Sequence, residues 1–290
     1  MVNKYRLSAS AFERETDDEK VDIQKIIFLS VEGNVTEKEY FEGISAYRGK
    51  LGINSRVDVE VLKRSRKDTN SAPRQVVELL EEYVRLRDAG REDLLEDIPK
   101  EFIKEYGIEF IMEYLENPER IPSHKKNAFK TELMKIGYDI NYRKYLKKYN
   151  HKLDEFAILI DRDIQSHSEV NMLDCINYCR EKGYNCYIAN PCFEFWLLLH
   201  LSDVKKEYKD DMEKIRENPK VSKQHTYVSR EVSDKAHHGK GGIGFKNNYL
   251  PFINDAIQRA KEFASEENDL LNQVGCNIWK LLEDMKGFGD

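Results

Sequence analysis

The chain has 290 residues, which is long enough for one large or two modest domains with a sizeable core. Charged residues make up 34% of the chain and its mean hydropathy is −0.71. The sequence contains neither a run of ~20 apolar residues nor the apolar core of a signal peptide. We therefore expect a cytoplasmic protein that makes no membrane contact. The formal net charge of −6 argues against a protein that coats nucleic acid without specificity. Binding of a phosphate-bearing substrate would therefore need local basic patches or a bound metal.

The amino-terminal part alternates short apolar runs with helical patterns. The apolar run Lys25–Gly33 ends in glycine and predicts a buried parallel strand. A helix is expected from Thr36 to Tyr47, and the alternating run Val57–Leu62 predicts a second strand. A basic loop and a helix over Arg74–Arg87 follow. Residues 91–150 are charged, rich in tyrosine and helical in period, which predicts an all-helical insertion.

The second half repeats the same alternation. Phe156–Asp163 is the clearest strand pattern, and the helix after it is expected to end at Gly183 as a C-cap. Tyr184–Pro191 predicts a fourth strand, with Asn190 as N-cap and Pro191 at the first position of an almost wholly apolar helix. From Ser202 onward the pattern is helical.

Strands that alternate with helices predict an α/β fold with a small parallel sheet flanked by helices. We assign 22–90 and 151–201 to this core, 91–150 to the helical insertion and 202–290 to a helical C-terminal tail. The cysteines are odd in number and form no CxxC pair, so buried free cysteine is favoured over a zinc site.

Three acidic residues fall at strand ends. Glu32 lies at the carboxyl end of the first strand, and Asp161 and Asp163 lie at that of the third. Ligands of open parallel sheets bind beyond these ends. Residues two apart in an extended strand project to one side, so Asp161 and Asp163 are expected to face the same way. Converging carboxylates repel each other unless a hard cation neutralises them, which predicts a Mg²⁺ or Mn²⁺ site.

Three strings carry a family resemblance: SVEGNVTEKEYF (Ser30–Phe41), ILIDRD (Ile158–Asp163) and NPCFEFWLLLH (Asn190–His200). The chain resembles the RloB-like family of toprim-related proteins. The resemblance implies a toprim-like core in which Glu32, Asp161 and Asp163 form a metal-dependent phosphoryl-transfer or phosphodiester centre. It also implies a bacterial antiphage or restriction-linked setting with a partner ATPase.

Within this picture Glu32 is either a general acid/base or a further metal ligand, and the sequence leaves both open. Glu194, in the first turn of the apolar helix, is either a complement to the helix dipole or a fourth acidic member of the catalytic set. His200 is expected to be a hydrogen-bonded core residue rather than a ligand.

Two basic segments are candidates for binding substrate phosphate. The loop after the second strand carries Lys63, Arg64, Arg66 and Lys67, and a glycine-rich loop further on carries Lys240 and Lys246. Solvated surface charge is the usual explanation for the first run, and a plain linker explains the second as well as a phosphate-contacting loop does. HHGKGGIG lacks the spacing of a Walker motif.

The leading hypothesis is a divalent-metal-dependent nuclease acting on RNA, including tRNA, or on DNA. One alternative is a non-catalytic regulatory or scaffold subunit of a defence complex, and another is a toprim-type nucleotidyl transferase. The sequence leaves self-association, the metal number and the choice between RNA and DNA open.

Overall fold

The computed structural model describes residues 25–33, 35–62, 72–88, 100–116, 120–135, 153–236 and 242–288. These residues form two compact units. The first unit described here contains 25–61, 72–77 and 153–288 apart from the gap at 237–241, and the second contains 62, 78–88 and the described residues of 100–135. Within the described residues, no helix is both long and apolar enough to cross a membrane.

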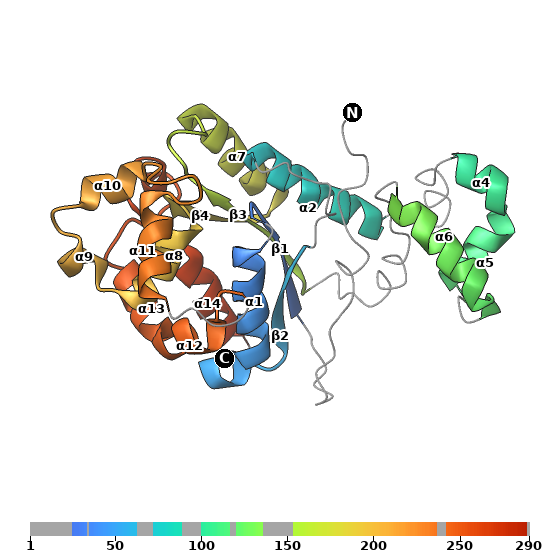
Figure 1. Cartoon of the computed structure of the whole chain (residues 1–290), viewed down its shortest axis with the longest axis horizontal. Helices are drawn as coiled ribbons and strands as arrows, with labels where there is room; N and C mark the ends of the chain where they lie inside the picture. The colour runs from blue at the N-terminus through green and yellow to red at the C-terminus, as the bar shows by residue number, and fades with distance from the viewer. Residues whose placement is uncertain are drawn as a thin grey trace. The chain divides into compact units, whose positions relative to one another are not determined.

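A five-stranded sheet organises the first unit, with strand order β2-β1-β3-β4-β5 among the described residues (Figure 1). The first four strands in this order run parallel, as predicted, and β5 pairs antiparallel with β4. The strands are β1 (Lys25–Val31), β2 (Val57–Val61), β3 (Glu155–Asp161), β4 (Asn185–Asn190) and β5 (Gly275–Cys276). Most residues of β1, β3 and β4 are buried, because helices cover both faces of a parallel sheet.

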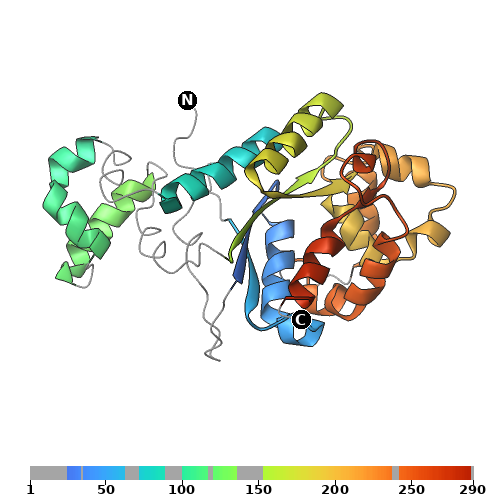
Figure 2. The ribbon, with the colours of Figure 1, turned by 180° about the vertical axis from the view of Figure 1, so that it is seen from behind.

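Helices lie on both faces of the sheet (Figures 1 and 2). One face carries α1 (Thr36–Tyr47), α8 (Phe193–Leu201) and α14 (Ile278–Lys286). The other carries α7 (Glu169–Lys182) and the beginning of α2 (Pro73–Asp88). On that face the Ser30 hydroxyl donates to the carbonyl of Val76 at 2.8 Å, which joins β1 to the start of α2.

Tyr40 is the centre of the core between α1 and α8. Its ring is fully buried and makes edge-on contacts with Phe193, Trp196 and Phe245, at centroid distances of 5.6, 6.3 and 5.3 Å. The Trp196 carbonyl lies 2.9 Å from Nδ1 of His200, so Nδ1 carries the proton and Nε2 accepts from the Tyr40 hydroxyl at 3.1 Å. Burial lowers the pKa of His200 to about 3, which keeps the ring neutral. The expectation of a hydrogen-bonded core histidine is confirmed.

The C-terminal region packs against the same sheet and core. Besides α14, its helices are α9 (Val204–Glu207), α10 (Met212–Glu217), α11 (Tyr227–Lys235), α12 (Phe245–Asn248) and α13 (Ile253–Ala260), with 3₁₀ turns η6 (Leu250–Phe252) and η7 (Asp269–Leu271). A further 3₁₀ turn, η2 (Arg48–Leu51), follows α1. The prediction of a purely helical tail is wrong at β5. A strand of two residues is too short to show an alternating pattern, so no sequence pattern predicts it.

The second unit contains three further helices: α4 (Lys100–Tyr106), α5 (Ile108–Glu116) and α6 (Ser123–Lys135). They surround a small core of Ile111, Tyr114, Ile121 and Phe129, which is separate from the core of the first unit. The described residues between 100 and 135 contain no strand.

Two predicted boundaries differ at the ends of β3 and β4. Strand β3 ends at Asp161, so Asp163 lies in the following loop rather than in extended strand. Asn190 is the last residue of β4 and not the N-cap of α8, a position that Cys192 occupies. The buried Asn190 amide donates to the carbonyl of Leu270 at 2.7 Å, and this bond to the C-terminal region holds it in the sheet. All five cysteines are buried and free, as expected.

Substitution of Gly275 in β5 would test how closely the C-terminal segment packs against the sheet. A Cβ at this position would lie 2.0 Å from the backbone oxygen of Ala264, so Gly275→Ala forces the backbone to shift. We expect a loss of about 1–3 kcal/mol in the free energy of unfolding, measured by urea denaturation. Gly49→Ala is the matched control, because a Cβ there meets nothing within 4 Å. Equal midpoints for the two variants would contradict the packing described here.

Candidate acidic centre

Neighbouring strands bring three predicted acidic residues to one edge of the sheet. Strand β1 pairs with β3, where Val31 lies beside Leu159, and β3 pairs with β4, where Asp161 lies beside Ala189. Glu32 directly follows β1 and Asp161 ends β3. Glu194 lies in the first turn of α8, just beyond β4. The carboxyl ends of these strands therefore form one acidic edge, as predicted.

Glu32 is held against the end of β3. Its Oε2 accepts a hydrogen bond from the backbone amide of Asp161 at 3.1 Å, across 129 residues of sequence. Its Oε1 lies 3.6 Å from Nε2 of His167, in the loop after β3. The hydrogen bond with Glu32 raises the pKa of His167, which favours the charged imidazolium beside the carboxylate. Both contacts fix the Glu32 side chain at the acidic edge.

Asp161 is the most strongly perturbed member of the group. Burial raises its pKa well above the usual value, and repulsion from Glu32, Glu37 and Glu194 adds to this. A hydrogen bond from the backbone amide of Phe193, at the start of α8, acts in the opposite direction. Asp161 thus lies among three other carboxylates and faces the amino-terminal end of a helix.

Glu37 belongs to the same cluster, although sequence analysis assigned it only a place in the first turn of a helix. Its side chain is 6% exposed, and its Oε1 accepts from the Gly33 amide at 2.9 Å. Burial, with repulsion from Glu194 and Glu32, raises its pKa to about 7. The available signal was positional: Glu37 begins the helix that leaves the carboxyl end of β1, as Glu194 does after β4.

Asp163 faces its own loop. Its Oδ1 accepts from the Gln165 amide at 3.2 Å and its Oδ2 accepts from the Ser166 hydroxyl at 2.6 Å. Its backbone amide donates to the Pro191 carbonyl at 3.0 Å, which ties this loop to the end of β4. The negative charge of Asp163 also attracts the imidazolium form of His167 and so helps to raise the pKa of His167.

Arg162, between the two aspartates, points away from them into the protein. Its side chain is 3% exposed, and it donates to the carbonyls of Leu271 at 2.6 Å and His167 at 2.7 Å. These bonds connect the end of β3 to η7 and to the loop that carries His167. Arg162 therefore positions the loop beside Glu32.

The comparison with protein-family models gives one match, to the model described as RloB-like protein, over residues 27–285. This range covers most of the chain and includes Glu32, Glu37, Asp161, Asp163 and Glu194. The chain belongs to the RloB-like family. No curated protein and no solved structure matches it. The predicted family is confirmed.

The donor set of this RloB-like chain fits a hard divalent cation in its chemistry. Carboxylate oxygens are the ligands that Mg²⁺ and Mn²⁺ prefer, and Mg²⁺ often uses one or two of them while keeping its waters. Desolvation and repulsion from neighbouring carboxylates raise the pKa of the Asp161 carboxyl, and a cation bound there would offset that repulsion. Among the described residues, however, no three His, Cys, Asp or Glu side chains are already spaced as metal ligands. Cation binding would therefore require side chains of the acidic edge to move from the positions they have in this structure.

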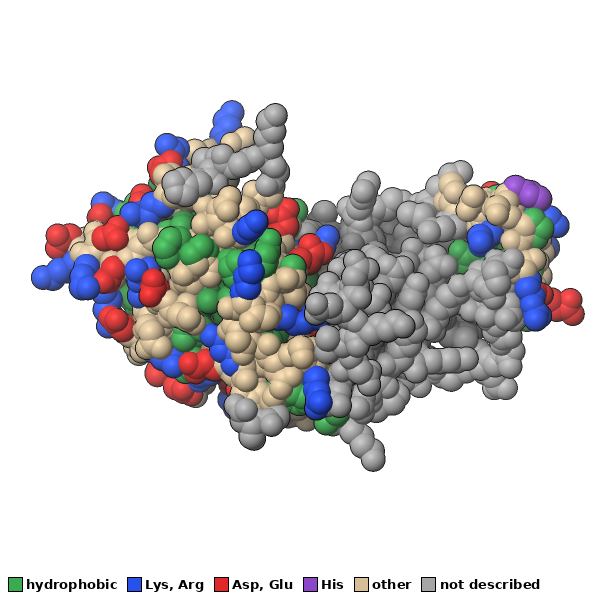
Figure 3. All heavy atoms as spheres, turned by 90° about the horizontal axis from the view of Figure 1, so that it is seen from below, with side chains coloured by type: hydrophobic (Ala, Val, Ile, Leu, Met, Phe, Trp, Pro, Cys, Tyr) green, Lys and Arg blue, Asp and Glu red, His purple; other side chains and the backbone are tan. Residues whose placement is uncertain are grey.

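The predicted phosphate-binding residues are only partly described. Lys63, Arg64, Arg66, Lys67 and Lys240 lie outside the described residues. Lys246 is exposed on α12, and no contact among the described residues joins it to the acidic edge. On the face of the RloB-like chain seen in Figure 3, lysine and arginine side chains lie interspersed with acidic ones.

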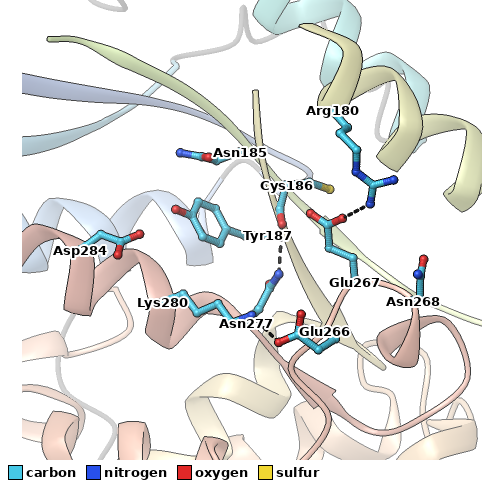
Figure 4. Close-up of a pocket in the computed structure, with 10 residues that line it drawn as sticks. All are labelled: Arg180, Asn185, Cys186, Tyr187, Glu266, Glu267, Asn268, Asn277, Lys280 and Asp284. Carbon is cyan, nitrogen blue, oxygen red and sulfur yellow. Dashed lines mark hydrogen bonds and ion pairs between the residues drawn. The ribbon is translucent and has the colours of Figure 1, made fainter. Parts of the chain in front are cut away.

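A hollow of about 400 Å³ lies elsewhere, beside the beginning of β4 (Figure 4). None of the acidic residues of the edge lines it. Its two cations are paired within the hollow, Arg180 with Glu267 and Lys280 with Glu266, each at 2.9 Å. Because these charges are already matched, the hollow is not the candidate site.

The carboxylate cluster predicts how a cation stabilises the RloB-like chain. In EDTA, Asp161→Asn should change the melting temperature by only a few degrees, since asparagine keeps an oxygen for the Phe193 amide. Added Mn²⁺ should raise the melting temperature of the wild type but not of Asp161→Asn, because the variant loses a charged oxygen ligand. Asp234→Asn is the control, as Asp234 pairs with Arg230 on exposed α11. Equal Mn²⁺ shifts in all three proteins would exclude Asp161 as a ligand.

Proposed function

We propose that the chain is a divalent-metal-dependent nuclease that hydrolyses phosphodiester bonds of RNA, including tRNA, or of DNA. The observation that carries this proposal is the meeting of Glu32, Glu37, Asp161 and Glu194 at the carboxyl edge of a parallel sheet. Carboxylates that crowd together repel one another and destabilise a fold unless a ligand neutralises them, and here Glu37 is buried while the other three are partly exposed. Membership of the RloB-like family supports the proposal, and we read the α/β core as toprim-like on the same ground.

In this proposal Glu32, Asp161 and Asp163 would hold one or two Mg²⁺ or Mn²⁺ ions, Asp163 after its carboxylate turns from its own loop towards the edge. A bound cation would polarise the scissile phosphate and lower the pKa of an attacking water. Glu37 and Glu194 would supply further oxygen ligands, directly or through water, from the first turns of α1 and α8. His167 would keep the Glu32 carboxylate oriented towards the edge, as its contact with Oε1 indicates. The cytoplasmic, antiphage setting and the partner ATPase are proposed from the family resemblance.

One observation favours a second candidate, a non-catalytic scaffold subunit of a defence complex. The described acidic residues lack ready ligand spacing, and Glu32 and Glu37 are each bound to a backbone amide. A scaffold role, however, gives no reason for four carboxylates that repel one another. The nuclease proposal therefore accounts for more of the structure.

The nuclease proposal predicts metal-dependent cleavage by the full chain. Plasmid DNA, single-stranded DNA and total tRNA would be incubated with the protein in Mg²⁺, Mn²⁺ or EDTA, and the products separated on denaturing gels. We expect cleavage of at least one substrate with metal and none in EDTA. Glu32→Gln and Asp161→Asn should each reduce the rate by at least about 100-fold, because each removes a charge that holds the cation.

Asp234→Asn should retain the wild-type rate, since it changes an exposed carboxylate outside the acidic edge. Cleavage that survives both Glu32→Gln and Asp161→Asn would rule out this centre. A wild type that binds Mn²⁺ but cleaves nothing would favour the scaffold candidate.

A further inference from the structure

Residues 218–226, between α10 and α11, form a compact loop beside the acidic edge, here called the 218–226 loop. Lys220 and Thr226 form an antiparallel bridge, and the amides of Val221 and Ser222 both donate to the His225 carbonyl. The Ser222 hydroxyl oxygen accepts from the His225 amide at 3.0 Å. The backbone of the loop is therefore held in one conformation by its own hydrogen bonds.

Two contacts attach this loop to the residues of the acidic edge. Asn218 adopts a left-handed conformation with φ 42°, and its amide donates to Sγ of Cys192, the N-cap of α8, at 3.4 Å. Cys192 is two residues before Glu194. On the other side, the side-chain amide of Gln165 donates to the carbonyl of Glu217, the residue before the loop, at 2.9 Å, and Gln165 follows Asp163 in the loop after β3. The 218–226 loop is thus anchored to two of the segments that carry the carboxylates.

The charge of the loop differs from that of the helices around it. Lys220 and Lys223 are exposed, and neither has an acidic partner among the described residues. Four neighbouring cations are paired locally: Lys214 with Asp211, Arg216 with Glu213, Arg230 with Asp234, and Lys235 with Glu207. The loop therefore carries two exposed lysines with no acidic partner among the described residues, and its base is attached to segments that carry the acidic edge.

We propose that the 218–226 loop binds the phosphate backbone of the nucleic-acid substrate through Lys220 and Lys223. Phosphates near the acidic edge are repelled by its carboxylates, so a polyanion needs positive charge close by to remain bound there. Two lysines on a rigid backbone supply this charge without reading bases, so RNA and DNA are both held. The proposal deepens the proposed function and rests on it, since it names the element that holds that substrate.

The test is nucleic-acid binding by the full chain in EDTA, where no cleavage is expected. A short fluorescent single-stranded DNA and a labelled tRNA mixture would be titrated with protein at salt concentrations from about 50 to 200 mM, with anisotropy as the readout. The Lys220→Gln/Lys223→Gln double variant should bind both probes roughly tenfold more weakly at the low-salt end. Its slope of log K against log salt for single-stranded DNA should fall by about 1.4, because two phosphate contacts are lost.

The matched control is Lys182→Gln/Lys209→Gln, which removes two exposed lysines outside the loop, one at the end of α7 and one after α9. It should keep the wild-type affinity and salt slope. If the wild type binds and both double variants match it, or both weaken equally, the assignment to the 218–226 loop is wrong while the nuclease proposal stands. If the wild type binds neither probe, the nucleic-acid function fails and the loop assignment falls with it.

Discussion

Repulsion among carboxylates at one edge of the sheet is the constraint on which the rest of the structure depends. The partly exposed Asp161 lies among Glu32, Glu37 and Glu194, and desolvation together with their charges raises its pKa. A fold selected only for stability would replace such a group with apolar side chains. The chain instead surrounds it with hydrogen-bond donors: the Asp161 amide for Glu32, the Gly33 amide for Glu37 and the Phe193 amide for Asp161. These donors offset part of the repulsion, and in our proposal a bound cation would offset the remainder.

Packing in the hydrophobic core of the first unit fixes the positions of these backbone amides. Tyr40 on α1 packs between Phe193 and Trp196 of α8, so the two helices that begin at the acidic edge are fixed relative to each other. Arg162 fixes the loop after β3 in the same way, through two carbonyls rather than through a carboxylate. Arg162 donates these hydrogen bonds to carbonyls. Burial lowers its pKa, and its charge acts on Asp163 only at longer range, by an attraction that opposes this lowering.

Much of this arrangement could be predicted from the sequence because it follows from local patterns. Apolar runs of strand length that alternate with helical patterns predict four parallel strands. Parallel strands share one carboxyl edge, and the structure places Glu32, Asp161 and Glu194 there. What the patterns could not give depends on contacts between distant segments. The short strand β5 exists through pairing with β4, and the direction of the Asp163 carboxylate is set by Ser166 and by the end of β4. Glu37 was overlooked because an acid in a first helical turn already has an adequate local explanation.

The net charge of the chain and the local charges near the acidic edge would act differently on a nucleic acid. A formal charge of −6 disfavours long-range attraction of nucleic acid, and the ion pairs on α10 and α11 leave little free positive charge there. Short-range contacts then matter more, since charges separated by more than about 10 Å are screened by salt. Lys220 and Lys223 lie on a loop that Asn218 and Gln165 attach to segments of the edge, so the short-range contacts that we propose would form there. In this proposal a substrate would be selected by its fit beside the carboxylates and not by the overall charge of the protein.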